Sequence, residues 1–267
     1  MPRSKRRKSG TDVYHVVSRG NDQMDILPQD GDKKYFRGLM KKEADRMGVE
    51  IYAYCVMSNH HHMLVKTDFK NLSQFMKEVN FRYAVYYNGK YDHSGHVFQG
   101  RFYSSGVETE AYLLSCIRYI HNNPVKAYIV PDILEYPFSS AAEYFSDFPR
   151  DFSGKLSENI KVRKGCISPE IVPILNSRFE NIEDFLKFHN IFDSQEFIDI
   201  DEEKSEYDHL RVKHFIESYK KENEIKDSDL LGKVPSLRDE FITRCSRETG
   251  LAKNRIKNIL KMVIKGA

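Results

Sequence analysis

Apolar and polar side chains alternate with a period of two in the stretch TDVYHVVSR at residues 11–19, which is typical of a β-strand. Residues 30–47 instead place apolar side chains at helical spacing, and Gly48 is a typical end signal for a helix. Two short apolar runs follow at residues 51–57 and 63–66, separated by the polar letters SNHHH. They predict two adjacent strands, with the histidines where the second strand begins.

Three further elements complete this part of the chain. A helical pattern covers residues 71–88, a strand is expected at 102–108, and a helix at 110–122 is expected to stop before Pro124. The order strand, helix, strand, strand, helix, strand, helix predicts an α+β fold. It suits a ferredoxin-like antiparallel sheet with helices packed on one face.

The end of the chain has a different pattern. Residues 237–262 carry two helical segments broken at Gly250, which predicts an all-α helix-turn-helix unit. We therefore expect a first domain at residues 1–150, an acidic connector at 151–204 and a helical domain at 205–267.

The composition argues against a membrane-spanning protein. Hydrophobic residues make up 40% of the chain, charged residues make up 30%, and the mean hydropathy is −0.60. No apolar run approaches the roughly 20 residues that a membrane span requires. The basic N-terminus leads into a strand rather than into an apolar segment with a cleavage site, and the four cysteines are scattered without a CxxC pair. These features predict a cytoplasmic protein with reduced thiols and no contact with a membrane.

The formal net charge of +3 is unevenly distributed. Basic residues dominate up to residue 130, acidic residues dominate from 131 to 204, and the C-terminal segment is basic again. Basic blocks attract phosphate backbones, but a surplus this small is more often a solvated surface. Charge alone therefore does not assign a nucleic-acid partner.

His60 and His62 are the first candidates for chemistry. In an extended chain, residues two apart point to the same side, as a chelating pair requires, and His61 faces the other way. Imidazole is a common ligand for divalent metals, and an added oxygen ligand would leave positions open for a phosphate oxygen. A polar turn or a set of hydrogen-bonded core histidines is the competing interpretation.

Tyr119 and Asn123 lie four residues apart, on one face of the helix expected at residues 110–122. A tyrosine can act as a covalent nucleophile in phosphoryl transfer when a nearby metal stabilises the developing charge. The chain contains 16 tyrosines, however, and most tyrosines pack in cores or on surfaces. The residue type alone does not select Tyr119.

Five ordered stretches together resemble the HUH single-tyrosine transposases, and in particular the branch associated with repeated extragenic palindromes. They are HVVSRGN, IYAYCVMSNHHHMLV, GHVFQGRF, RYIHNNPVKAYIV and YPFSSAAEY. The stretches extend from Tyr14 to Tyr144, about half of the chain, which makes the match more specific than a single short motif.

The resemblance implies roles for four residues. The two metal-binding histidines of the family fall on His60 and His62, its nucleophile on Tyr119, and its third metal ligand on Asn123. His61 departs from the pattern, because the family usually has an apolar residue between the two histidines.

The resemblance also implies a magnesium or manganese ion and a reaction. Tyr119 would attack a phosphate of single-stranded or hairpin DNA, leaving a 5′-phosphotyrosine bond and a free 3′-hydroxyl, and a 3′-hydroxyl of another strand would reverse the step. The base that accepts the tyrosine proton is not assigned. His121 is close in sequence but is expected to point to another side of the helix.

Basic and aromatic residues that could grip such DNA occur in both halves of the chain. They are Arg3, Lys5, Arg6, Arg7, Lys8, Arg19, Arg82, Phe98, Arg101 and Tyr103, together with Lys253, Asn254, Arg255 and Lys257 on the second helix of the helix-turn-helix. For each of them a surface or core role is an equally good interpretation. The terminal helices could also be an ordinary helical hairpin.

Two other functions remain open. A DNA-binding protein derived from a transposase would use the basic residues without cleavage, although retention of His60, His62, Tyr119 and Asn123 together argues against it. A hydrolase that activates water at the histidine pair would not need Tyr119 and would form no covalent adduct. The sequence leaves the oligomeric state open.

Overall fold

A computed structural model describes residues 6–146, 165–191, 201–223, 225 and 234–265. The chain divides into two compact units, one of Met1–Pro124 and Pro131–Ile198 and one of Val125–Val130 and Asp199–Ala267. Arg3 and Lys5, both candidates for DNA binding, lie outside the described residues, as does part of the segment expected to be a connector.

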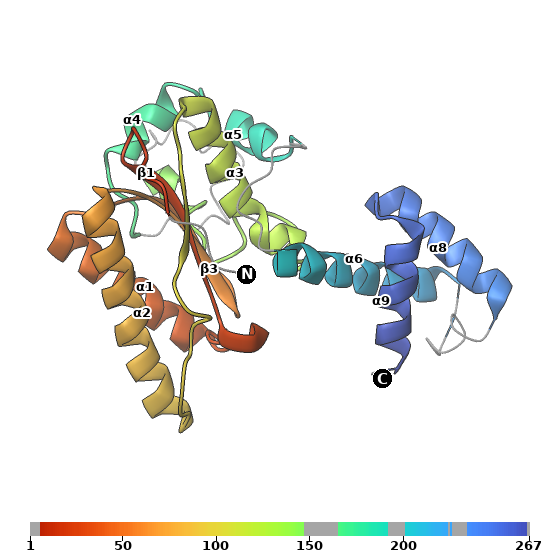
Figure 1. The fold of residues 1–267 in the computed structure, drawn as a ribbon. Coiled ribbons are helices and arrows are strands. Elements are labelled where there is room, and N and C mark those ends of the chain that lie inside the picture. The colour runs from red at the N-terminus through yellow and green to blue at the C-terminus, as the bar shows by residue number, and fades with distance from the viewer. Residues whose placement is uncertain (1–5, 147–164, 192–200, 224, 226–233, 266–267) are drawn as a thin grey trace. The chain divides into compact units, whose positions relative to one another are not determined.

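The first unit is built on an antiparallel sheet of four strands (Figure 1). The strands are β1 (Val13–Arg19), β2 (Glu50–Val56), β3 (His60–Lys66) and β4 (Tyr103–Gly106), in the order β2-β3-β1-β4. Along the chain, helix α1 (Asp30–Met47) connects β1 to β2, and helix α2 (Phe69–Tyr91) connects β3 to β4. This is the ferredoxin-like arrangement that the sequence predicts. Strand β3 begins three residues earlier than expected, because the histidines pair with β1 instead of forming a turn.

Helices cover both faces of this sheet. Helices α1 and α2 lie on one face, where the ring of Phe36 in α1 packs 4.6 Å from that of His61 between ring centroids. Helix α3 (Glu110–Lys126) lies on the opposite face, because Tyr119 packs against His15 and His62. The expectation of helices on one face holds for α1 and α2, whereas α3 adds a layer on the other side.

Helix α3 does not stop before Pro124, so the predicted end at residue 122 is wrong. Proline has no N–H to donate to the carbonyl four residues earlier, which here belongs to Ile120. The side-chain amide nitrogen of Asn123 donates to that carbonyl at 3.2 Å, and to the carbonyl of Tyr119 at 2.9 Å. The amide therefore replaces the missing backbone donor, and the helix continues to Lys126.

Short elements add to the first unit: the 3-10 helices η1 (Asn21–Gln23) and η2 (Glu143–Ser146), and helices α4 (Ile171–Asn176) and α5 (Ile182–His189). Part of the expected connector is thus helical. The segment also touches the edge strand β2, where the backbone N–H of Ser168 donates to the carbonyl of Ile51 at 2.8 Å.

A buried chain of hydrogen bonds joins α3 to α5. His189 Nδ1 lies 2.8 Å from the carbonyl of Phe185, so this nitrogen carries the proton. His189 Nε2 then accepts from His121 Nδ1 at 2.9 Å, and His121 Nε2 accepts from the Ser140 hydroxyl at 2.9 Å. His121 consequently points away from the His15 and His62 rings. In this arrangement both imidazoles are neutral.

This arrangement predicts a loss of stability in acid. Burial lowers the pKa of His189 from its usual 6.5 to about 4. As the pH falls below about 6.5, the unfolded chain takes up a proton at His189 that the folded chain does not, so the free energy of unfolding decreases by up to about 3 kcal/mol by about pH 4. Denaturant unfolding followed by circular dichroism at about pH 6.5 and about pH 4 measures the loss from all buried histidines together, and the difference between the wild type and a His189 variant gives the share of His189. His189→Gln, which keeps an acceptor for His121 but cannot titrate, is expected to lose less, and equal losses would contradict the assignment.

The second unit is helical. Helices α6 (Asp201–Glu222), α8 (Pro235–Thr249) and α9 (Lys253–Lys265) enclose their own apolar core. Gly250 separates α8 from α9 with a left-handed φ of 73°, a conformation that favours glycine. The predicted pair of C-terminal helices is therefore confirmed.

All four thiols of the chain are free and buried. Within the described part of the chain, each helix is too short or too polar to span a membrane.

Candidate active site

The two candidate metal ligands lie side by side on the central strand β3. Their alternation places His60 and His62 on the sheet face that α3 covers, with ring centroids 5.0 Å apart. His61 points to the other face, against Phe36 and Phe98. The same-side geometry expected for the pair is thus present.

Tyr119 packs against one member of this pair, His62. Its ring centroid is 5.5 Å from that of His62 and 5.8 Å from that of His15, both in edge-to-face contact. Asn123 follows one helical turn later, and both side chains are almost completely buried. The structure therefore places Tyr119 against His62, with His60 beside His62 and Asn123 one turn further along α3, and it adds His15, which sequence reasoning did not select.

Hydrogen bonds determine which nitrogen of each histidine can bind a metal. His60 Nδ1 lies 2.6 Å from Oδ1 of Asn59, and His62 Nδ1 lies 3.1 Å from Nε2 of His15. With both Nδ1 atoms engaged in this way, Nε2 is the nitrogen of each ring that suits metal ligation. Such outer contacts fix the orientation of metal-binding histidines in many proteins.

The histidines are held neutral. Burial, together with the nearby positive charge of Arg19, lowers the pKa of His60 to about 3, and burial lowers the pKa of His15 to about 3. A neutral imidazole has a lone pair to offer a metal ion at physiological pH. Arg19 itself is 2% exposed and pairs with His60 across the β1–β3 ladder, so it lies beside the candidate ligands rather than on the outer surface.

Asn123 has a defined orientation. Its side chain faces the carbonyl oxygens of Tyr119 and Ile120, so the atom facing them is the amide nitrogen. The side-chain oxygen is then the atom that would ligate a metal. Among the described residues, no three His, Cys, Asp or Glu side chains are grouped to hold a metal. A site here consequently depends on two imidazoles plus an amide oxygen, a donor set that suits a divalent ion and leaves positions for phosphate oxygens.

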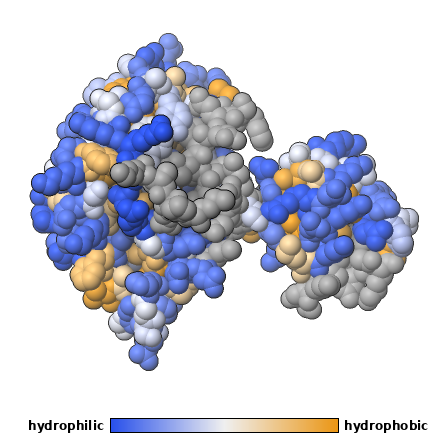
Figure 2. Space-filling view, viewed as in Figure 1, coloured by the Kyte–Doolittle hydropathy of each residue, from blue (hydrophilic) through white to orange (hydrophobic). Residues whose placement is uncertain are grey.

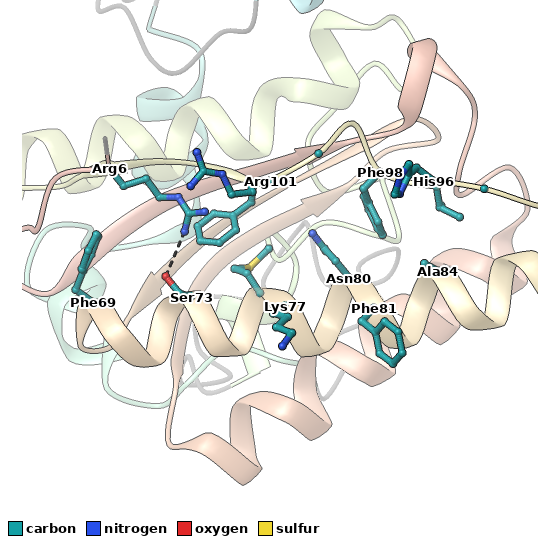
Figure 3. Close-up of a pocket in the computed structure, with 15 residues that line it drawn as sticks. Arg6, Phe69, Ser73, Lys77, Asn80, Phe81, Ala84, His96, Phe98 and Arg101 are labelled. Atoms are coloured by element: carbon teal, nitrogen blue, oxygen red, sulfur yellow. Dashed lines mark hydrogen bonds between the residues drawn. The ribbon is translucent and has the colours of Figure 1, made fainter. Parts of the chain in front are cut away.

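The candidate DNA-binding residues of the first unit fall into two groups. Most of them line two adjoining cavities, of about 790 Å³ and about 850 Å³; these are Arg6, Arg7, Lys8, Phe98, Arg101 and Tyr103. Figure 3 shows the first of these cavities, with Arg6, Phe98 and Arg101 labelled. Arg82 differs, because it forms ion pairs with Glu43 at 3.1 Å and Glu78 at 3.3 Å. Its charge is already matched within the protein.

Sequence reasoning missed several residues of these cavities, including Lys77 and Phe81 on α2. A signal was present, because Phe81 falls outside the apolar stripe of Leu72, Phe75, Met76 and Val79. A large aromatic residue on the polar side of a helix is unusual enough to be a binding candidate.

The candidates of the second unit lie on α9. Lys253, Asn254 and Lys257 are exposed, whereas Arg255 is partly buried and pairs with Asp208 at 3.1 Å. Three of the four side chains are therefore accessible to a partner on this helix.

Known proteins provide a comparison. Residues 11–123 match the family described as transposase, IS200-like. Among solved structures, a REP-associated tyrosine transposase bound to a REP hairpin is similar over 52% of this chain and 82% of its own, with 19% identity and a TM-score of 0.45. A protein described as a transposase of Deinococcus radiodurans R1 is similar over 46% of this chain and 95% of its own, with 19% identity and a TM-score of 0.33. No curated protein matches the chain.

Proposed function

Because residues 11–123 carry a domain of the IS200-like transposase family, as the sequence motifs predict, we propose that the protein cleaves single-stranded DNA and rejoins it through a covalent bond to Tyr119. The observation that supports this most is the position of Tyr119, 5.5 Å from His62 between ring centroids and one helical turn before Asn123. The proposed nucleophile thus contacts His62, one of the proposed metal ligands, and His60 lies beside His62 on the same face of the sheet.

The reaction is a transfer of a phosphoryl group in two steps. The phenol oxygen of Tyr119 attacks the scissile phosphorus and loses its proton, while the bond from phosphorus to the 3′-oxygen breaks and that oxygen gains a proton. A 5′-phosphotyrosine and a free 3′-hydroxyl result. Attack by the 3′-hydroxyl of another strand then releases Tyr119 and joins the DNA.

The residues around Tyr119 would orient and stabilise the phosphate. His60 and His62 through Nε2, and Asn123 through its side-chain oxygen, would hold a magnesium or manganese ion, which when bound polarises the phosphate oxygens. The guanidinium of Arg19 lies beside His60 in a buried site, where a positive charge stabilises developing negative charge strongly.

The partner is single-stranded or hairpin DNA, and the cationic cavities beside β4 support this assignment. We also propose that the helical domain at residues 205–267 binds DNA, since Lys253, Asn254 and Lys257 are exposed on α9. Cleavage does not depend on this second proposal.

One experiment separates the three functions that the sequence leaves open. The protein is incubated with a labelled single-stranded hairpin and manganese, and the products are run on a denaturing gel. A covalent protein–DNA adduct is the expected result. Cleavage without an adduct would instead indicate a water-activating hydrolase, and binding without cleavage would indicate a DNA-binding protein.

His15 is expected to act as a positioning residue for this site. His15→Phe keeps an aromatic ring but removes the acceptor for His62 Nδ1, so we expect the affinity for manganese to fall by about 10- to 100-fold. His15→Gln carries a side-chain oxygen that can replace Nε2 as acceptor, and we expect it to restore most of the affinity. Electron paramagnetic resonance of free manganese measures the binding.

A merely structural role of His15 would give a different result. Thermal unfolding of both variants shows whether the fold is retained, because His15 is completely buried. If folded His15→Phe bound manganese as tightly as the wild type, His15 would not orient His62.

A further inference from the structure

A cavity of about 790 Å³ lies between α2 and residues 95–102 (Figure 3). It lies beside the α2 face of the sheet, whereas Tyr119 packs on the opposite face. Backbone hydrogen bonds hold the residues 95–102 against the end of β1: Asn21 N–H donates to the carbonyl of Val97 at 2.8 Å, and Gln99 N–H donates to the carbonyl of Arg19 at 2.9 Å. The wall of the cavity is therefore fixed by the fold, which makes the cavity largely preformed.

The lining of this cavity combines aromatic rings with positive charge. The aromatic rings come from Phe69, Phe81, Phe98 and Phe102, and the cationic side chains are Arg6, Lys77 and Arg101. Among the described residues that line it, none is acidic, although the chain contains 39 acidic residues. This composition suits an anionic ligand with flat, apolar parts.

Phe81 is the clearest sign of a missing partner. Its side chain is 64% exposed, although burial of a phenylalanine ring is normally favourable. Apolar atoms appear at the surface of the first unit in the region of α2 (Figure 2). In Figure 3 the labelled Phe81 and Lys77 project from neighbouring turns of α2. A stacking ring and a charge for a phosphate are thus placed side by side.

The cavity continues around the edge of the sheet. Arg6, Arg101 and Phe102 line both this cavity and the second one of about 850 Å³ along β4. The guanidinium carbon of Arg6 lies 3.7 Å from the centroid of the Phe102 ring, so this junction is itself a cation on an aromatic face. Tyr103 of the second cavity is paired with Val17, which is also paired with His62, so its side chain lies on the sheet face of the candidate active site. The second cavity therefore reaches the sheet face on which Tyr119 packs.

We propose that the cavity between α2 and residues 95–102 binds unpaired nucleotides of the DNA strand, with a base stacked on Phe81 and the backbone phosphates near Lys77 and Arg101. The proposal rests on the proposed function for the identity of the strand as DNA. A base can stack on an exposed aromatic ring, which Phe81 provides, and backbone phosphates are attracted to cationic side chains, which Arg6, Lys77 and Arg101 provide. Paired bases cannot stack on Phe81, so the site discriminates single strands from duplexes.

The test compares two exposed apolar residues on the same helix. Phe81→Ala removes the stacking ring, and Val85→Ala removes an apolar side chain that is 58% exposed one turn later and does not line the cavity. Fluorescence anisotropy measures binding of the full chain to a labelled oligothymidylate of about 12 nucleotides, within the site sizes known for single-strand binding. We expect Phe81→Ala to bind at least about fivefold more weakly and Val85→Ala to bind like the wild type.

Charge provides a second comparison on α2. The slope of the logarithm of the binding constant against the logarithm of the salt concentration counts the counterions released on binding. Lys77→Ala is expected to reduce this slope by about one. Lys70 is exposed but does not line the cavity, so Lys70→Ala is expected to leave the slope unchanged. The same oligothymidylate annealed to oligoadenylate is expected to show no effect of Phe81→Ala.

Several results would overturn the proposal. Equal affinities of Phe81→Ala and Val85→Ala for the single strand would exclude stacking, and an equal loss with the duplex would exclude recognition of unpaired bases. The proposed nuclease activity fails separately, because it predicts a Tyr119-dependent adduct. If no adduct forms but Phe81→Ala still weakens binding of the single strand, the result supports nucleotide binding in the cavity and contradicts the proposed cleavage reaction.

Discussion

Tyr119→Phe is expected to abolish the covalent protein–DNA adduct and to reduce strand cleavage by at least about 10⁴-fold, the scale seen when a catalytic nucleophile is removed. The change deletes only the hydroxyl group, so the edge-to-face contacts of the ring with His15 and His62 remain. Binding of a labelled hairpin is expected to stay within about twofold of the wild type, because the stacking and cationic residues are unchanged. Denaturing gels measure the adduct, and anisotropy measures binding.

Tyr112→Phe is the matched control, since Tyr112 lies on the same helix two turns earlier. It is expected to form the adduct like the wild type. An adduct that persisted in Tyr119→Phe would identify another nucleophile, and cleavage that persisted without an adduct would favour attack by water.

The second large effect concerns the histidine pair. His62→Ala removes one of the two imidazoles, and we expect manganese affinity and strand cleavage each to fall by at least about 100-fold. Removal of the metal ion from the wild-type protein with a chelator is also expected to stop cleavage, while binding of the hairpin is retained. Calorimetric titration with manganese and gel assays of cleavage measure the two effects.

His61→Leu tests whether manganese binding depends on the two histidines that share one face of the sheet. His61 lies on the opposite face of the sheet, against Phe36 and Phe98, so it cannot share a metal with His60 and His62. We expect this variant to bind manganese and cleave DNA like the wild type. A loss equal to that of His62→Ala would show that the three histidines act together and that the same-side arrangement is not what matters.

Much of the first unit follows from local patterns. Periods of two and of 3.6 along the chain predict the strands and helices and, through their order, the ferredoxin-like sheet. The pairing of His60 and His62 on one face follows from strand alternation, and the spacing of Tyr119 and Asn123 from the helix. Each of these depends on residues close together in sequence.

The parts that sequence reasoning missed depend on distant residues. His15 meets His62 only because β1 and β3 pair, and their separation of 47 positions carries no local signal. The cavity beside α2 requires residues 95–102 to lie along the end of β1 and beside α2. The continuation of α3 past Pro124 requires a side-chain donor that helix propensity does not consider.

The helix-stabilising amide of Asn123 and its proposed role as a metal ligand together have an evolutionary consequence. Aspartate would be a stronger ligand for a divalent ion, but it has no N–H to give to the carbonyls of Tyr119 and Ile120, so the change would weaken the helix that carries the nucleophile. Pro124→Ala would return a backbone donor to the Ile120 carbonyl and relieve Asn123 of that task. The two positions are therefore expected to be epistatic: with Pro124 present, position 123 needs an amide N–H, and with Pro124 replaced, a carboxylate could take the place of the proposed amide ligand.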